Sequence, residues 1–563
     1  MNNLLFDSLS SLYPSAQFEI STPTLEHGDL TTNIALVLAK QENMAPRDLA
    51  QKIINDLNAL PSVSTVFSRF EIAGPGFINA FYSPKYVAEE YRKILIDIDS
   101  YGLNQSRLGQ KVIVEYTDPN PFKEFHIGHL YPNIVGETIA RLNEAAGAKV
   151  FRAVYQGDVG MHVAKTMWGM KKLMETEHLT IDSLEAMSLN DRVAFMGRAY
   201  AFGATAYKDN EEAISEMKVL NKKVYEKDIE VYGLYQKGKS WSMEYFDKMY
   251  ERLGTHFDLF YLESEVADDA VTLVRENLNK GIFTESQGAI VYEGEKDGLH
   301  TRVFINSQGI PTYEAKDLAL ASRKVKDVPY DESIIVTGNE VDSYFKVILK
   351  VLSKINPELA AKTKHISHGM ITLPEGKISS RTGHIITAAS LLDTAAAEAQ
   401  KLGQTIDASL SEKVGLAAVK YALLKSNLGG DVEYSFATSV TFNGNSGPYL
   451  QYTYARTQSL REKSSVTQDA DGVVLDTLRT EEQELMRFLA RYPGIIVDVQ
   501  KKYSPSMLCT YLYELASKFN FYYNVQQIVG SDQEAFRVHL AASVGQVLKN
   551  GLHILGIEAL PKM

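Results

Sequence analysis

The spacing of hydrophobic and polar positions changes several times within the first hundred residues. Residues 33–40 have apolar positions at helical spacing, whereas residues 67–73 and 77–81 show the short β-like runs of strands. A polar, turn-rich stretch begins at residue 101 and ends this alternation. We therefore predict a small α/β domain over residues 1–105.

A different pattern begins at residue 111. Residues 111–116 form a β-branched run of the kind that is buried in parallel sheets, and residues 134–146 have the apolar spacing of a helix. Residues 150–155 form a second β-like run. Since strand, helix, strand is the repeating unit of a parallel α/β sheet, this order predicts an α/β domain built on such a sheet.

The sheet domain is predicted to span residues 106–385 and to contain a helical insertion. From about residue 164 to 263 the pattern is long, charged and helical. Strand-like runs return afterwards, at 288–292, 302–306 and 333–337.

After about residue 385 almost every segment has helical periodicity. We predict a helical connecting region at 386–439 and an all-α bundle over residues 440–563.

Composition excludes several classes of protein. The chain has 563 residues, of which 45% are hydrophobic and 23% charged, as in folded multidomain proteins. No apolar run approaches the roughly 18 residues of a membrane span, and the first residues lack a basic region before their leucines. Cys509 is the single cysteine, so neither an internal disulfide nor a cysteine-based zinc site is expected. We expect a cytoplasmic protein without a membrane segment or structural metal.

The charge balance limits how the chain can bind nucleic acid. It has 58 basic and 70 acidic residues, a formal net charge of −12. A coat of basic side chains that binds nucleic acid everywhere is therefore excluded, and any such contact must be local.

One apparent nucleotide motif is rejected by its context. Residues 233–240 match the phosphate-binding pattern G-x-x-x-x-G-K-[ST], which works only between a buried strand and a helix. The preceding residues 221–230 are charged and have helical periodicity. We interpret this match as part of a helix.

The most informative segment is the H-x-G-H sequence formed by His126, Gly128 and His129. It follows the first strand of the predicted sheet and precedes a helix, which is where ligands bind in open α/β sheets. Two imidazoles at a helix N-terminus can bind phosphate oxygens, and Gly128 leaves room for a flat adenine ring. The pattern favours an ATP site over the alternative of a helix start with two surface histidines.

A second segment, residues 373–383, gathers Lys377, Ser379 and Arg381 between two glycines. Such a loop can bring positive charge onto a polyphosphate, although alone it is also compatible with an ordinary polar turn. The order of H-x-G-H and, about 250 residues later, K-x-S-x-x resembles the two signatures of class I aminoacyl-tRNA synthetases. Ser380 stands at the signature's second lysine position, so we expect Lys123, just ahead of the first signature, to supply the missing cation.

Within that class the chain resembles the arginyl-tRNA synthetase family over nearly its whole length. The similar stretches are residues 27–33, 72–79, 114–120, 155–160 and 447–456. The resemblance implies a Rossmann-like parallel-sheet catalytic domain with a helical insertion, an additional α/β N-terminal domain that contacts tRNA, and an all-α C-terminal anticodon-binding bundle.

The resemblance also implies how arginine is bound. A planar guanidinium needs carboxylates placed for paired hydrogen bonds. Glu115, Tyr313 and Asp317 would hold the side chain, and Asp118 and Asn120 would lie near the α-amino group. Without the family context, Tyr313 and Asp317 could equally be a pair on a helix face. Where the family usually has glutamine, this chain has Val341.

The implied reaction is ATP-dependent activation of L-arginine to arginyl-adenylate, followed by transfer to the 3′ end of tRNA(Arg), with Mg²⁺ accompanying ATP. A class I synthetase for another amino acid and a non-catalytic tRNA-binding paralogue are the alternatives. We expect a monomer. The implied catalytic residues are His126, His129, Lys377 and Lys123. The implied ATP-binding residues are His126, Gly128, His129, Met370, Lys377, Ser379 and Arg381.

Several tyrosines and basic residues of the C-terminal region are candidates for contacts with RNA. The tyrosines could stack on anticodon bases, although their helical spacing also suits core packing. These tyrosines are Tyr449, Tyr452, Tyr454, Tyr511, Tyr513, Tyr522 and Tyr523. Arg456, Arg461, Lys501 and Lys502 are candidates for phosphate contacts.

Overall fold

The computed structural model describes residues 2–373, 376–377, 387–403, 407–465 and 478–563. The chain forms two compact units. The first contains Met1–Ser106, Leu402–Tyr421 and Val440–Met563, and the second contains Arg107–Lys401 and Ala422–Ser439. Residues 386–439, predicted as one connecting region, are thus divided between the two units.

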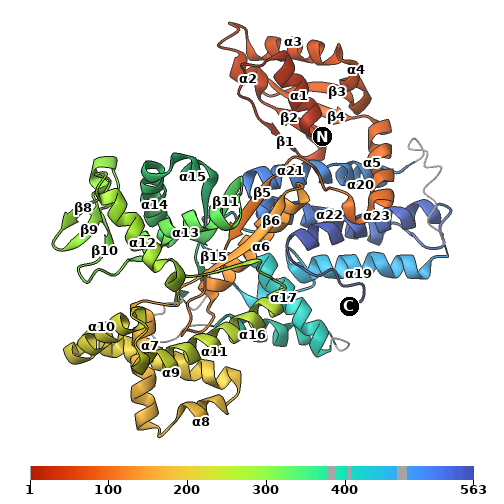
Figure 1. Cartoon of the computed structure of the whole chain (residues 1–563). Helices are drawn as coiled ribbons and strands as arrows, with labels where there is room; N and C mark the ends of the chain where they lie inside the picture. Colours follow the sequence, from red (N-terminus) through yellow and green to blue (C-terminus); the bar gives the residue numbers. More distant parts are fainter. Residues whose placement is uncertain (1, 374–375, 378–386, 404–406, 466–477) are drawn as a thin grey trace. The chain divides into compact units, whose positions relative to one another are not determined.

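The second unit is built on a five-stranded parallel sheet with the order β12-β11-β5-β6-β7 (Figure 1). The strands are β5 (Lys111–Glu115), β6 (Lys149–Gln156), β7 (Leu259–Leu262), β11 (Glu332–Gly338) and β12 (Thr363–His368). Val112, Ile113 and Val114 are fully buried in the central strand β5, as the β-branched run predicts.

The strand order creates a site for a ligand at the carboxyl end of β5. The chain leaves β5 toward β6 and β7, and later returns to the other side of β5 through β11. Ligands bind where the direction of winding reverses in this way. Helix α6 (Ile127–Ala145) connects β5 to β6.

Three further helices pack against the sheet and build a core with it: α12 (Glu263–Leu278), α13 (Tyr313–Asp327) and α14 (Asp342–Ile355). Ile113, Val266, Leu318 and Val351 belong to this core.

The predicted insertion is a group of helices between β6 and β7 (Figure 1, yellow to yellow-green). They are α7 (Met161–Thr176), α8 (Ile181–Glu185), α9 (Leu189–Asp209), α10 (Glu211–Tyr225) and α11 (Ile229–Leu253). A Cβ on Gly203 would lie 2.1 Å from the carbonyl oxygen of Lys165, so glycine lets α7 and α9 approach closely. Residues 233–240 lie inside α11, which confirms that their phosphate-loop pattern is a helix.

Two sequence predictions about strands were incomplete. The helical pattern was extended to residue 263, whereas Leu259–Leu262 is strand β7 of the main sheet, because four apolar residues fit a buried strand as well as a helix turn. The strand-like runs at 288–292 and 302–306 belong to a separate antiparallel sheet of β8 (Thr284–Ser286), β9 (Ala289–Tyr292) and β10 (Arg302–Ile305), whereas the run at 333–337 is β11 of the main sheet.

The remaining elements of the second unit lie between residues 357 and 439. It contains α15 (Pro357–Lys362), β13 (Ile371–Leu373), β14 (Gly376–Lys377), α16 (Ala388–Gln400), β15 (Val432–Glu433) and α18 (Phe436–Ser439). Strand β13 pairs with both β14 and β15.

The first unit joins the N-terminal α/β domain to the C-terminal helices. Its antiparallel sheet has the order β1-β2-β4-β3, and prolines in the first turn help to start many of its helices. The strands of this sheet are β1 (Ile20–Ser21), β2 (Leu30–Thr32), β3 (Phe67–Ala73) and β4 (Phe77–Tyr82). The helices of the N-terminal domain are α1 (Asn2–Leu12), α2 (Ile34–Leu38), α3 (Pro46–Asn58), α4 (Pro61–Val66) and α5 (Pro84–Asp97). The bundle contains α17 (Ala408–Leu424), α19 (Gly447–Lys463), α20 (Thr480–Ala490), α21 (Tyr492–Lys502), α22 (Pro505–Val525) and α23 (Glu534–Ile554).

A buried carboxylate ties these two parts of the first unit together. Asp29 accepts a hydrogen bond from the backbone N–H of Tyr82, and forms ion pairs with Arg487 at 3.0 Å and Arg491 at 3.3 Å.

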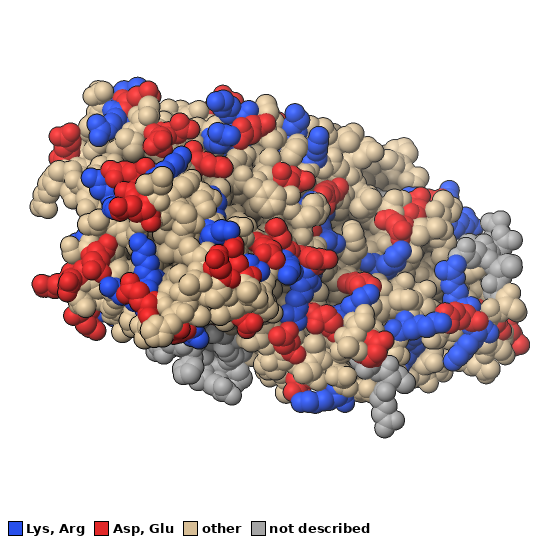
Figure 2. Space-filling model, turned by 60° about the horizontal axis from the view of Figure 1, so that its bottom comes forward, with Lys and Arg blue, Asp and Glu red and all other residues tan. Residues whose placement is uncertain are grey.

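Charges of both signs are mixed on the molecular surface. Figure 2 shows Lys and Arg side chains lying among Asp and Glu side chains on one face, without a continuous basic area. Among the described helices, none has the length and apolar character needed to cross a membrane.

Candidate active site

The loop that follows β5 has an unusual backbone held in place by surrounding groups. Thr117, Asp118 and Phe122 have φ angles of 81°, 41° and 67°, in the left-handed region that side chains disfavour. The amide of Asn133 donates to the Thr117 hydroxyl at 3.0 Å, and the Asp118 carboxylate accepts from the backbone N–H of Tyr155 at 2.8 Å. These bonds fix the loop between α6 and β6.

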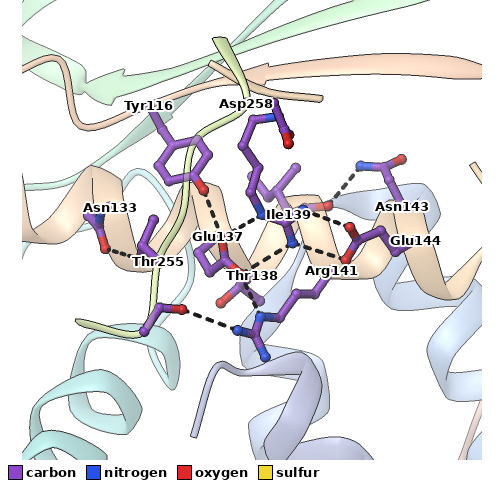
Figure 3. A network of polar contacts seen from close by, with 12 residues as sticks. Tyr116, Asn133, Glu137, Thr138, Ile139, Arg141, Asn143, Glu144, Thr255 and Asp258 are labelled. Carbon is purple, nitrogen blue, oxygen red and sulfur yellow. Dashed lines mark hydrogen bonds and ion pairs between the residues drawn. The ribbon is translucent and has the colours of Figure 1, made fainter. Parts of the chain in front are cut away.

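A buried charge network anchors α6 to the sheet (Figure 3). The Glu137 carboxylate on α6 accepts from Tyr116 Oη at 2.7 Å, Arg141 Nε at 2.6 Å and Arg152 Nε at 2.9 Å. Burial opposes its ionisation, but the bonds and charge of Arg152, with help from Arg141 and Tyr116, hold the pKa of Glu137 below its ordinary value. The network fixes the helix whose first turn carries the H-x-G-H sequence.

His126 and His129 form a stacked pair at the start of α6. Their ring centroids are 3.7 Å apart, and Nδ1 of each accepts from a backbone N–H, of Gly128 and of His126 respectively. The proton of each neutral ring therefore lies on Nε2. A Cβ on Gly128 would lie 2.9 Å from the His126 ring, so this position needs glycine.

Both histidines are neutral at physiological pH. Burial, and then the charge of Lys123, lowers the pKa of His126 to about 4. Burial, the neighbouring His126 and Lys123 lower the pKa of His129 well below its usual value. The pair therefore offers two N–H donors rather than two cations.

Lys123 supplies the positive charge beside this pair. Its Nζ lies 4.6 Å from the centre of the Tyr200 ring on α9, and burial lowers the pKa of Lys123 to about 8. The lysine thus stays mostly charged at neutral pH in a partly dry place, where a charge acts more strongly than in water.

The residues that follow the second signature lie beside the first signature. Thr387 forms a bridge with His126, and the backbone N–H of Ala388 donates to the carbonyl of Phe125 at 2.8 Å. The backbone of Lys377 pairs with Thr372 in the β13–β14 hairpin. The predictions for the Lys377 side chain and for Ser379 and Arg381 lie outside the described residues. Met370 is partly exposed, and its backbone N–H donates to Asp431.

Three of the residues predicted to bind arginine come together as an acidic cluster. Burial, followed by the charge of Glu115, raises the pKa of Asp118 well above its ordinary value. Burial raises the pKa of Asp317 to about 7, with Glu115 contributing and a hydrogen bond from Tyr344 opposing. In the described part of the chain neither aspartate forms an ion pair, so both carboxyl groups are open to a cation, whose charge would favour their ionised forms.

Glu115, unlike the two aspartates, forms an ion pair within the described part of the chain. Its Oε2 is 2.8 Å from Lys324 Nζ on α13, and both side chains are buried. Lys316 forms a similar buried pair with Glu263 at the start of α12. Lys324 could not be found from the sequence, because Glu115 lies 209 residues before it and only the packing of α13 beside β5 joins them.

Tyr313 and Asn120 complete the predicted set. Tyr313 is 48% exposed, and its hydroxyl lies 3.3 Å from Nδ1 of His162. Nε2 of His162 donates to the carbonyl of Gly157 at 2.7 Å, which leaves Nδ1 to accept from Tyr313. A Cβ on Gly157 would lie 2.4 Å from Asn120 Oδ1, so glycine keeps space beside this amide.

Three family descriptions match almost the whole chain. Residues 91–436 match "tRNA synthetases class I (R), catalytic domain", residues 450–563 match "DALR anticodon binding domain", and residues 2–82 match "Arginyl tRNA synthetase N terminal domain". The chain belongs to the arginyl-tRNA synthetase family.

Individual relatives agree with this placement in the family. The chain is 30% identical to an arginine–tRNA ligase of Fusobacterium nucleatum, over 99% of this chain and 97% of the relative. It is 29% identical to an arginine–tRNA ligase of Bacteroides thetaiotaomicron, over 99% and 98% of the two chains. The structure of Thermus thermophilus arginyl-tRNA synthetase shares its fold, with a TM-score of 0.81, 22% identity, and coverage of 99% of this chain and 98% of that one.

The tyrosines of the DALR region divide into two groups. Tyr454, Tyr511 and Tyr522 are buried, which matches the core-packing interpretation. Tyr452 and Tyr523 both contact Arg456, with ring centres 5.0 Å and 4.6 Å from its guanidinium carbon. This cluster of one cation and two rings is suited to stacking on an unpaired base.

Proposed function

We propose that this chain is an arginine–tRNA ligase, which activates arginine with ATP and transfers it to tRNA. The observation that carries the proposal is the pair of carboxylates, Asp118 and Asp317, which form no ion pair among the described residues and lie at the switch point of a class I sheet. Arginine carries two cations, a guanidinium suited to Asp317 and an α-ammonium group suited to Asp118, so two carboxylates at this place favour it as the substrate.

In the first step an oxygen of the arginine carboxylate attacks the α-phosphorus of ATP. The bond from that phosphorus to the bridging oxygen breaks, and arginyl-adenylate and pyrophosphate form. In the second step a terminal ribose hydroxyl of tRNA attacks the acyl carbon, loses its proton and releases AMP. No side-chain nucleophile is needed, so catalysis consists of positioning and charge stabilisation.

The stacked histidines and two lysines are assigned to the phosphates. Nε2–H of His126 and of His129 donate to phosphate oxygens, as the neutral state of both rings allows. Lys123 and Lys377 offset the negative charge that develops on the departing pyrophosphate. The bridge between Thr387 and His126, which returns the chain to the first signature, supports a role for the Lys377 loop there.

Arginine recognition is assigned to two sets of residues, one for the guanidinium and one for the α-amino group. Asp317 and Tyr313 on α13 hold the guanidinium, with Glu115 contributing through the charge that it shares with Lys324. Asp118 and Asn120 face the α-amino group. His162 fixes the Tyr313 hydroxyl.

Mg²⁺ is proposed to arrive with ATP, held mainly by the phosphates. In the described residues no three His, Cys, Asp or Glu side chains gather as a metal site, which favours this arrangement over a cage of protein ligands. When bound it would neutralise phosphate charge.

We further propose that the enzyme acts as a monomer on tRNA(Arg) in the cytoplasm, where tRNA and ATP are available. One chain carries the catalytic, N-terminal and anticodon-binding regions of the family, which supports a complete site without a second subunit.

ATP–pyrophosphate exchange with arginine, lysine and citrulline, each with and without tRNA, tests the function. Citrulline has nearly the shape of arginine without its charge. Arginine should support exchange, and both analogues should be rejected by at least about a hundredfold. Citrulline would leave a buried carboxylate without a cation, and the compact ammonium of lysine lacks the planar pair of donors of a guanidinium. Equal use of citrulline would show that the acidic cluster does not select the substrate. Exchange with another amino acid, or none despite tRNA binding, would support the two alternatives instead.

A further inference from the structure

The carboxylate of Asp317 is held by a side chain from a different helix. Tyr344, in the first turn of α14, donates its hydroxyl hydrogen to Asp317 Oδ2 at 2.6 Å. In the described part of the chain, Tyr344 is the one side chain that donates a hydrogen bond to this carboxylate. Because α13 and α14 both pack in the core beside the sheet, the geometry of this bond is set by the fold.

The ring of Tyr344 is itself held by neighbouring side chains. The guanidinium carbon of Arg302, on β10, lies 5.3 Å from the centre of the Tyr344 ring, and Arg302 forms an ion pair with Glu314 at 3.1 Å. The edge of Phe345 also contacts the ring, with centroids 5.2 Å apart. A phenol whose ring is held by a cation and a neighbouring aromatic has little freedom to leave the carboxylate.

The charges around Asp317 make this hydrogen bond important. Negative charge faces it from Glu115 on β5, Asp118 in the following loop and Glu263 on α12, and Lys316 and Lys324 on its own helix are paired with two of these acids. The buried hydroxyl of Tyr155 on β6 also lies close enough to interact. An aspartate in such a place loses its charge readily unless a donor stabilises the ionised form.

We propose that Tyr344 is a positioning residue for arginine recognition, whose hydroxyl keeps the Asp317 carboxylate oriented and charged toward the guanidinium. The inference rests on the proposed function and adds a residue that acts only through Asp317. Tyr344 does not itself contact arginine.

The direction of the pH effect follows from the bond. The pKa of Asp317 is about 7, so its charged form, and with it arginine binding, is lost as pH falls through that value. The Tyr344 hydrogen bond lowers this pKa. Removing it therefore moves the loss of arginine binding to higher pH.

The experiment compares Tyr344→Phe with the parent enzyme between about pH 6 and about pH 9, with KM for arginine, KM for ATP and kcat measured separately. We expect KM for arginine at neutral pH to rise about fivefold, because a pKa increase of about one lowers the charged fraction of Asp317 from about one half to about one eleventh, with KM for ATP unchanged. The rise should shrink at the alkaline end. Tyr292→Phe is the matched control, because it removes a tyrosine–aspartate hydrogen bond, to Asp297, outside the site.

A double-mutant cycle decides whether Tyr344 acts through Asp317. In an Asp317→Asn background, Tyr344→Phe should cause no further increase in KM for arginine. Additive losses, or a KM increase that is the same at every pH, would overturn the inference. So would an unchanged KM for arginine in Tyr344→Phe while Asp317→Asn raises it, and that result would leave the proposed function intact. Absence of arginine-dependent activity in the parent enzyme would refute the proposed function itself.

Discussion

Replacement of Lys123 by alanine should impair amino-acid activation more than any other change in the loop after β5. Burial lowers the pKa of Lys123 from 10.5 to about 8, which corresponds to a cost of about 3 kcal/mol for holding the charge in the free enzyme. A bound polyphosphate can offset most of this cost. We therefore expect Lys123→Ala to raise the activation free energy by about 2–3 kcal/mol. This change lowers kcat/KM for ATP roughly 30- to 150-fold.

The assay is arginine-dependent ATP–pyrophosphate exchange as a function of pH. In the parent enzyme kcat/KM for ATP should fall as pH rises through about 8, because free Lys123 then loses its proton. Lys123→Arg should remove this alkaline decline, since guanidinium stays charged. Lys165→Ala is the control, because Lys165 also lies over a tyrosine ring, that of Tyr207, at 3.8 Å. Near-normal exchange in Lys123→Ala would refute the phosphate role and make Arg381 the next candidate.

Three further outcomes follow from the site and its support. His129→Ala should slow adenylate formation by at least about tenfold with little change in tRNA affinity, whereas equal losses in both would indicate misfolding. Asp317→Asn should weaken arginine use by about 2–5 kcal/mol while ATP binding is kept, and an unchanged KM for arginine would remove its assigned role. Glu137→Gln should lower the free energy of unfolding by about 3 kcal/mol at neutral pH, measured by urea titration. Because folding lowers the pKa of Glu137, this contribution should disappear as pH falls below the ordinary glutamate range, and a loss of stability independent of pH would contradict it.

The sequence revealed the local parts of the catalytic unit. The β-branched run at 111–116 forms strand β5, and the helix predicted at 134–146 is present as α6, because burial on two faces and helical periodicity each leave a pattern within a few residues. Helix α6 begins earlier than predicted, at Ile127, so that H-x-G-H lies in its first turn. Strand β7 was assigned to a helix, since Leu259–Leu262 is too short for its periodicity to decide.

Interactions between distant elements could not be predicted in this way. Lys324 and Tyr344 each contact a predicted substrate residue, but only after α13 and α14 have packed beside β5. Neither position belongs to a motif, and a lysine or tyrosine on a helix face has many possible partners. The resemblance predicts which residues carry the chemistry, whereas the structure shows which side chains contact them.

Charging of unfractionated tRNA with each of the twenty amino acids in turn tests the central claim most directly. With ATP present, the enzyme should attach arginine, and it should attach none of the other nineteen to a comparable extent. Asp317→Asn should abolish most of this charging at low arginine concentration. Part of the charging should return at a higher arginine concentration, as expected for a lost contact with the substrate. Attachment of a different amino acid, or no attachment of arginine by an enzyme that still binds tRNA, would contradict the account.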